Sequence, residues 1–449
     1  SSIFAMGFSL LITYFLAKLL APEKLGILMT AEAFVDLFRF FFYFGFNNTI
    51  LKFASEHTEG FEKGLNKAVG NAFLIKACIT LPLVIAILLI SKFSIKDIAL
   101  QEIIHIYTWV FILESFSSLF GIARRALGQF KLISGITILN KVLRLITILV
   151  VLNYTKDLKI LVLAFLLEKI IRLFVSWITT NKFIKMELDL ANIKTMIKDC
   201  FGYAFVDPLQ GVQNKIDRVM INSFLGPAAV AFYTIPSKIS TAIQTFIKTG
   251  SSTLAPNLHG SLRNDEENYK KSMYHIFRFS NIAAVLSFYV IYFFAQKFLM
   301  LLFGDKYSGS YGVVYLFSYL SMISILESTP EIAFTTKASH KTRIFYKTLS
   351  LLINIVLNII FLAKFGIKGA IFATIIANTV RLIIQYWFTR NDFKFSKVIL
   401  HCLLPVLAMH FLNPYLSLIS YIIFIAVSKQ ITMEDLRRIP KLIFKQKND

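Results

Sequence analysis

The sequence predicts an all-α, polytopic membrane protein of about 14 transmembrane helices, and three observations predict it. Of the 449 residues, 56% are hydrophobic and only 16% are charged, whereas an ordinary soluble domain is about 25% charged. The chain holds 45 Phe residues, far more than a single soluble core needs. Apolar runs recur from one end of the chain to the other. Soluble enzymes, disordered tails and disulfide-rich secreted domains are therefore poor fits.

The apolar runs can be divided into spans by length. A bilayer core about 30 Å thick needs about 20 apolar helical residues per crossing. This criterion gives fourteen spans, with limits near 1–20, 25–50, 67–91, 102–122, 132–153, 157–180, 199–223, 227–250, 273–297, 310–335, 341–363, 368–390, 397–412 and 414–428. Because the last two are short, twelve spans followed by a shallow hairpin is the alternative.

The basic residues predict the orientation. The net charge of +22 would suggest nucleic acid in a soluble protein, but here Lys and Arg lie between apolar runs, as they do at the cytoplasmic face of a membrane. If the N-terminus is cytoplasmic, every inside loop carries at least three basic residues and every outside loop at most two. We therefore expect both termini inside, no nucleic-acid partner, and membrane lipids around the helices.

The chain also contains an internal repeat. The segment Leu20–Gly26, between the first two spans, matches Leu225–Ala231, between spans seven and eight, and Asn140–Arg144 is echoed by Asn354–Asn358. Six spans separate the members of each pair, which predicts a parallel duplication with a binding site between the halves. The predicted units are an N-terminal lobe over 1–198, a C-terminal lobe over 199–396, and a helix pair with a basic cytoplasmic tail over 397–449.

Three predicted spans carry polar stripes, although charge at bilayer depth is expensive. In span 25–50, Glu32, Asp36, Arg39, Tyr43 and Asn47 fall on one helical face. Similar stripes occur in the next lobe: Asp207, Gln210, Asn214 and Asp217, then Tyr233, Ser237, Thr241, Gln244 and Lys248. The stripes predict an aqueous central cavity lined by these three spans. The alternative is a set of buried ion pairs, such as Asp36 with Arg39.

The deep charges are mostly basic, which favours an anionic ligand such as a pyrophosphate group. Spans 132–153 and 157–180 add Lys141, Arg144, Glu168, Lys169 and Arg172, of which Glu168 and Arg172 could neutralise each other across one helical turn. The guanidinium fork and the ammonium point charge both suit phosphate oxygens. The predicted substrate-binding residues are Arg39, Lys215, Arg218, Lys238, Lys141 and Arg144.

No catalytic constellation, metal-binding spacing, nucleotide-binding motif or large exterior loop is present in the sequence, so we predict a transporter without a cofactor rather than an enzyme. Net transport then needs an ion gradient, which H⁺ or Na⁺ could supply at an intramembrane carboxylate. Glu32 is the predicted titrating group, with Asp36 as the partner that holds Arg39. Asp207, in the opposite lobe, is the reserve candidate.

Several segments together resemble the Wzx-type polysaccharide flippases of the multidrug/oligosaccharidyl-lipid/polysaccharide (MOP) superfamily. They are Leu20–Gly26, Asp217–Gly226 followed by Tyr233 and Lys238, and Asn354, Asn358, Gly366–Ala370, Ala373 and Thr374. The resemblance implies two six-helix lobes around a V-shaped cavity lined chiefly by helices 1, 2, 7 and 8. In the related lipid II flippases an extra helix pair forms a groove for the lipid tail.

The resemblance also implies a function. An undecaprenyl-pyrophosphate-linked oligosaccharide, the repeat unit of O-antigen or capsule, would move across the cytoplasmic (inner) membrane by alternating access and pass to a polysaccharide polymerase. A multidrug or toxin antiporter of the same fold is the first alternative, disfavoured because such exporters favour cationic drugs and acidic cavities. A membrane glycan polymerase or ligase is the second, disfavoured by the short exterior loops.

Overall fold

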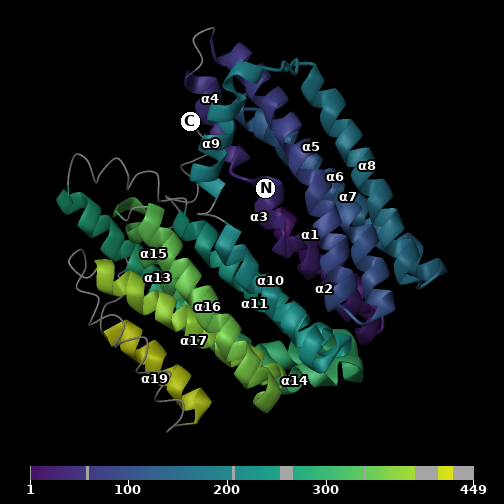
Figure 1. Ribbon diagram of the computed structural model, residues 1–449. Helices are drawn as coiled ribbons and strands as arrows, with labels where there is room; N and C mark the ends of the chain where they lie inside the picture. Colours follow the sequence, from purple (N-terminus) through teal and green to yellow (C-terminus); the bar gives the residue numbers. More distant parts are fainter. Residues whose placement is uncertain are drawn as a thin grey trace.

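The computed structural model describes residues 2–56, 60–204, 208–252, 266–337, 340–389 and 413–427, and within these ranges all regular elements are helices. Long helices lie side by side in two groups, the purple-to-blue helices of the N-terminal half and the teal-to-yellow helices of the C-terminal half (Figure 1). Six of the helices in these ranges are long and apolar enough to cross a membrane. The predicted all-α polytopic architecture is confirmed.

The first group follows the predicted spans one to six. It consists of α1 (Ser2–Leu19), α2 (Pro22–Leu37), α3 (Arg39–Tyr43), α4 (Phe46–Glu56), α5 (Phe61–Ser94), α6 (Ile98–Ala126), α7 (Phe130–Tyr154) and α8 (Leu158–Asn181). The helices begin where the sequence supplies a start signal. Pro22 begins α2, where its missing N–H has no helical partner to lose, and the Asp97 and Asp157 side chains cap α6 and α8.

The second group follows the later spans. It consists of α10 (Pro208–Leu225), α11 (Pro227–Ser252), α13 (Glu266–Phe303), α14 (Ser308–Val314), α15 (Leu316–Lys337), α16 (His340–Phe365), α17 (Ile367–Thr389) and α19 (Pro414–Val427). A shorter helix, α9 (Ile193–Ala204), packs against α4 and α5 of the first group. The predicted span 397–412 and the tail after 427 lie outside the described residues.

Two predicted spans are divided in the structure. Span 25–50 is broken at Phe38 and again at Phe44 and Gly45, whose φ angles of 29° and 70° lie in the left-handed region and end α3. Glycine adopts this conformation without a steric penalty, so the sequence does carry the signal for the second break. Span 199–223 is divided between α9 and α10, with a proline at the first position of α10.

The two groups meet where the repeated segments lie, at the N-termini of α2 and α11. A Cβ atom on Gly26 would lie 1.7 Å from the carbonyl oxygen of Pro227, so only glycine allows this close approach. Nearby, the Lys306 Nζ donates hydrogen bonds to the carbonyl oxygens of Ala17 and Lys18, each at 2.8 Å. The molecule is thus closed at this end by contacts between the groups.

Large apolar side chains cover the outer faces of the helices. Leu81 and Phe93 of α5, Phe174 of α8, Phe294 of α13 and Trp387 of α17 are all more than half exposed. Such a surface is expensive in water and is expected against lipid chains. Together with the apolar helices, it identifies the chain as a multi-pass membrane protein.

The last described helix, α19, packs on the outside of the second group (Figure 1). The Tyr289 hydroxyl of α13 lies 2.7 Å from the Ser417 hydroxyl of α19, and Tyr421 packs against the Tyr289 ring. This helix corresponds to the second member of the predicted C-terminal helix pair.

Candidate functional site

A cavity of about 390 Å³, called the central cavity below, lies where α1, α2, α6, α7 and α8 of the first group face α11 of the second. Its charged lining consists of the acids Glu32, Asp36, Glu114 and Glu168 and the bases Arg39, Lys141, Arg144, Lys169, Arg172 and Lys238. The bases outnumber the acids, so the cavity favours an anionic ligand. The lining includes Lys141 and Arg144 of α7, which were predicted to bind substrate, but none of its described residues comes from α10, which was predicted to line the cavity.

Ion pairs between neighbouring helices neutralise part of this lining. The Arg144 guanidinium of α7 lies 2.7 Å from the Glu168 carboxylate of α8. Glu114 of α6 lies 3.3 Å from the Lys169 ammonium and 3.5 Å from the Arg172 guanidinium, both on α8. The expected pairing of Glu168 with Arg172 is therefore wrong, because α7 and α6 bring each of them a closer partner of opposite charge.

A second set of ion pairs joins the two helix groups. The Lys215 Nζ of α10 lies 2.5 Å from Asp36 and 3.7 Å from Glu32, both on α2. The same Asp36 carboxylate accepts a hydrogen bond from the Arg39 Nε at 3.1 Å, so the predicted pair of Asp36 and Arg39 is present. Beyond the end of α2, Arg39 of α3 continues the same polar face, and its guanidinium lies over the Tyr43 ring. Asn47 lies in α4, after the break at Phe44 and Gly45.

Three cations near the cavity form no ion pair with a described residue: Lys141, Arg218 and Lys238. The Lys141 Nζ donates a hydrogen bond to the Ser9 hydroxyl at 2.9 Å. Arg218 of α10 is only 7% exposed, yet its Nε and one terminal nitrogen, Nη1, have no hydrogen-bond partner in the described chain. Buried donors without partners are unfavourable, so these atoms are candidates for contact with a ligand.

The remaining carboxylate of the cavity, Glu32, lies among these cations. The charges that act on it most strongly belong to Lys215, Lys238, Arg218 and Arg144, which come from α7, α10 and α11. The charge that acts most strongly on Lys238 is that of Arg218. Six predicted substrate-binding residues thus divide into two sets: Arg39, Lys215 and Arg144 have acidic partners, whereas Lys141, Arg218 and Lys238 have none among the described residues.

Asp217 of α10 is fully buried in a cluster of neutral polar groups that links four helices. Its carboxylate accepts hydrogen bonds from the Asn358 amide at 2.8 Å, the Thr374 hydroxyl at 2.8 Å and the Tyr233 hydroxyl at 3.1 Å. Asn354 completes the cluster through hydrogen bonds with Asn358 and Thr374. The contact with Tyr233 links α10 to α11.

The Asp217 cluster has an unbalanced charge. The described chain supplies no cation within ion-pair distance of the carboxylate, and the Asn358 side-chain oxygen is buried without a hydrogen-bond partner. Sequence reasoning did not assign these asparagines to a site. Their spacing of one helical turn, in an otherwise apolar span, was the available signal.

A second buried network, between α15 and α17, corresponds to the ion pair between α6 and α8 in the N-terminal half. Arg381 of α17 makes a two-nitrogen contact with the Glu327 carboxylate of α15, with one of the distances at 2.7 Å. This pair matches the contact of Arg172 with Glu114 between α8 and α6, the equivalent helices of the first half. The ion pair is therefore repeated along with the sequence segments, as expected for an internal duplication. Asp207, the reserve coupling residue, lies outside the described residues.

The fold is shared with solved transporters. An inward-facing multidrug resistance MATE family transporter of the MOP superfamily aligns with a TM-score of 0.72 at 12% identity, over 87% of this chain and 94% of its own. The lipid II flippase MurJ in an inward closed conformation aligns with a TM-score of 0.72 at 15% identity, over 95% of each chain. At such identities the likeness shows the fold alone.

A third solved structure is a MOP superfamily transporter from Pyrococcus furiosus described as having a binding pocket of reverse polarity, with a TM-score of 0.61 at 12% identity over 89% of this chain and 94% of its own. No curated protein matches the sequence. The family of polysaccharide biosynthesis proteins matches residues 1–259, more than half of the 449 residues, and the chain belongs to this family of flippases with the MOP transporter fold.

Proposed function

We propose that the protein is a flippase that moves undecaprenyl-pyrophosphate-linked oligosaccharide repeat units across the cytoplasmic (inner) membrane by alternating access. The family and the fold support a polysaccharide transporter. The observation that carries the finer proposal is a set of three cations without acidic partners among the described residues: Lys141 and Lys238, which line the central cavity, and the buried Arg218 of α10, whose charge acts on Lys238. A buried excess of positive charge needs an anion, and the pyrophosphate group is the anionic part of such a lipid.

The three cations come from different helices and offer different kinds of contact to a pyrophosphate group. Lys141 of α7, Arg218 of α10 and Lys238 of α11 come from both helix groups, so a pyrophosphate held among them would bridge the groups. Arg218 offers two unpartnered N–H donors to phosphate oxygens, and the lysines offer point charges. Arg39, Lys215 and Arg144 contribute to the same field, and their carboxylate partners keep them in place before the ligand arrives.

Alternating access requires the two helix groups to separate at one end and close at the other. With both termini cytoplasmic, the closed end at Gly26 and Pro227 faces the periplasm, and the protein is ready to receive substrate from the cytoplasmic leaflet. Opening toward the periplasm would break the Lys215–Asp36 ion pair and the hydrogen bonds of Lys306. The delivered repeat unit would then serve a polysaccharide polymerase.

Ion coupling can act at two carboxylates. Glu32 shares Lys215 with Asp36, so neutralising Glu32 with H⁺ or Na⁺ would weaken the contact between the groups. Asp217 is buried beside the unpartnered oxygen of Asn358, and an oxygen-only donor set of this kind suits H⁺ or Na⁺. Asp217, Asn358 and Thr374 would hold the ion, which would balance the buried charge.

The test is native mass spectrometry of the protein purified from cells that make the polysaccharide. We expect a bound species with the mass of a polyprenyl-pyrophosphate glycan, and loss of surface glycan when the gene is deleted. A multidrug antiporter would instead change drug susceptibility and leave the glycan intact. If the protein were a polymerase or ligase, deleting its gene would abolish the polymer. Transfer of repeat units to the periplasmic leaflet would continue undiminished, as detected by their accessibility to a glycosidase in the periplasm.

A further inference from the structure

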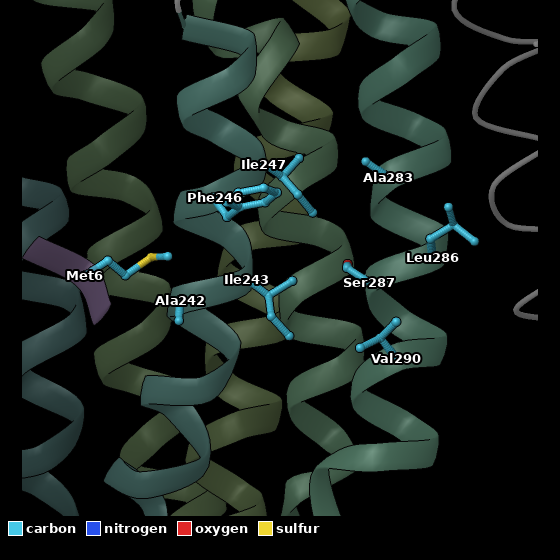
Figure 2. A pocket seen from close by; sticks show the side chains of 9 residues that line it. All are labelled: Met6, Ala242, Ile243, Phe246, Ile247, Ala283, Leu286, Ser287 and Val290. Atoms are coloured by element: carbon cyan, nitrogen blue, oxygen red, sulfur yellow. The ribbon is translucent and has the colours of Figure 1, made fainter. Parts of the chain in front are cut away.

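Lys76 of α5 is a buried cation that lines neither of two cavities. One is the central cavity, and the other, of about 420 Å³, lies between α1, α11 and α13 and is lined by 9 uncharged residues (Figure 2). Lys76 is only 2% exposed. No carboxylate of a described residue lies within ion-pair distance of its Nζ. Burying an ammonium without a carboxylate is unfavourable, so the site must stabilise the charge in another way.

The Lys76 ammonium is enclosed by one carbonyl group and three aromatic rings, which we call the ammonium cage. Its Nζ donates a 2.6 Å hydrogen bond to the carbonyl oxygen of Ser115 in α6. The centroids of the Tyr43, Phe46 and Phe116 rings lie 5.3, 5.4 and 5.8 Å from the Nζ. A ring face attracts a cation within about 6 Å, and more strongly where water is excluded. The cage therefore attracts an ammonium, and an apolar side chain of the same length would lose this attraction.

Two rings of the cage lie on opposite sides of the break between α3 and α4. Tyr43 is the last residue of α3, and Phe46 is the first of α4. Between them, Phe44 has a φ angle of 29°, a conformation that is uncommon for a bulky residue and persists only where its surroundings hold it. By attracting both rings, Lys76 helps to hold the break.

Tyr43 connects the ammonium cage to the central cavity. The Arg39 guanidinium lies 5.1 Å from the centroid of the Tyr43 ring and 5.6 Å from that of Phe111. The Arg39 side chain is 48% exposed and lines the central cavity, so its guanidinium is accessible to a ligand. The Tyr43 ring thus contacts two cations, Arg39 in the cavity and Lys76 outside it.

We propose that Lys76 is a positioning residue for the anionic group of the substrate. Its ammonium keeps Tyr43 and Phe46 in place across the helix break, and the Tyr43 ring in turn keeps the Arg39 guanidinium at the surface of the central cavity. This inference rests on the proposed function and adds to it a residue that acts through Arg39 without touching the substrate. Asp36 also holds Arg39, at 3.1 Å, so loss of Lys76 should misplace the guanidinium without releasing it.

The experiment measures binding of geranyl pyrophosphate to the purified protein and its variants. Lys76→Met removes the charge and keeps the length of the side chain, and we expect it to weaken binding by roughly three- to tenfold. Lys76→Arg keeps a cation that can stack on the rings and should bind within about twofold of the wild type.

A second pair of variants separates positioning from a general loss of stability. In an Arg39→Ala background, Lys76→Met should cause no further loss of binding, because its effect passes through Arg39. Asn71→Leu is the matched control on α5, since the buried Asn71 amide makes two 2.9 Å hydrogen bonds with the backbone of Asp189. It should lower the melting temperature and leave binding unchanged.

The outcomes separate the inference from the function on which it rests. If the wild type does not bind geranyl pyrophosphate, the proposed function fails and the inference fails with it. If the wild type binds, but Lys76→Met binds equally well or loses as much affinity without Arg39 as with it, the inference alone fails. Phe46→Leu keeps Lys76 and removes one ring of the cage, so it repeats the measurement if Lys76→Met does not fold. Binding by Phe46→Leu as tight as that of the wild type would then overturn the inference.

Discussion

Lys215 of α10 and Asp36 of α2 lie 2.5 Å apart, nitrogen to oxygen, and this ion pair joins the two helix groups. Asp36 is only 7% exposed, so removing Lys215 leaves a buried carboxylate whose one remaining cationic partner among the described residues is Arg39. Breaking a buried pair is strongly destabilising, whereas removing both partners is not.

We therefore predict that Lys215→Ala lowers the free energy of unfolding by about 1–3 kcal/mol and that Lys215→Ala with Asp36→Ala loses less than the sum of the single changes. Thermal melting of the purified proteins measures both effects. Additive losses would show that the two side chains contribute independently and do not hold the groups together.

Arg218 gives a prediction in which stability and binding move in opposite directions. Its buried Nε and Nη1 lack hydrogen-bond partners in the part of the chain that the structure describes, so Arg218→Met, which keeps length and removes charge, should melt at the wild-type temperature or higher. The same change should weaken binding of a polyprenyl pyrophosphate by about 1.5–3 kcal/mol, the loss of one charge-assisted hydrogen bond.

Lys238→Ala should weaken binding in the same way, and Lys159→Ala is the control, because the exposed Lys159 pairs with Glu102 outside the central cavity. Tight binding by Arg218→Met, at matched folding, would remove Arg218 from the substrate site.

The sequence was informative about the helices and about which faces carry charge, since both follow from local periodicity. Asp36 and Arg39 are three residues apart, and their pairing could be predicted from that spacing. Partners distant in sequence could not be predicted. Glu168 pairs with Arg144, and Asp217 binds Asn358 and Thr374, because packing of separate helices decides these contacts. For the same reason, the contribution of α6 to the lining of the central cavity was not expected, whereas Lys141 and Arg144 of α7 were among the predicted cavity residues.

Gly26 gives a prediction about the closed end. Its Cα lies so close to Pro227 that Gly26→Ala must move α2 away from α11, whereas Gly121→Ala in α6 is a control with open space around the added methyl group. We expect Gly26→Ala to open this end. A cysteine at the buried Leu20, in a protein without its native cysteines, should then react faster with a thiol reagent. Equal rates in the Gly26→Ala and Gly121→Ala proteins would contradict this.

The orientation of the chain can be measured in whole cells. We predict that single cysteines at Asp305 and Lys364, both exposed at helix ends, react with an impermeant thiol reagent added outside, and that one at Lys194 of α9 does not. Permeabilised cells supply the control, in which all three should react. Labelling of the residue 194 variant in intact cells would invert the topology, and the closed end would then face the cytoplasm.

The last prediction concerns ion coupling, and two conservative substitutions can show which carboxylate is responsible for it. Glu32→Gln leaves Lys215 paired with Asp36 alone and removes a carboxylate that an ion could neutralise. We expect it to bind the lipid-linked substrate and to lose transport driven by an imposed H⁺ or Na⁺ gradient in proteoliposomes. Asp217→Asn instead removes the buried charge beside Asn358. It should abolish any rise of the melting temperature with Na⁺ or with falling pH that the wild type shows, since no carboxylate remains to hold the ion.

The two carboxylates are distinguished by measuring both gradient-driven transport and the ion-dependent melting shift on each variant. If coupling acts through the contact between the helix groups, Glu32→Gln keeps the ion-dependent melting shift while losing gradient-driven transport. If Asp217 alone holds the ion, Glu32→Gln transports normally, and Glu32 is then a structural partner of Lys215. Arg381→Gln is unsuitable as a control because it leaves Glu327 buried without its cation. The conservative change Glu102→Gln, at an exposed ion pair outside the central cavity, should alter neither measurement.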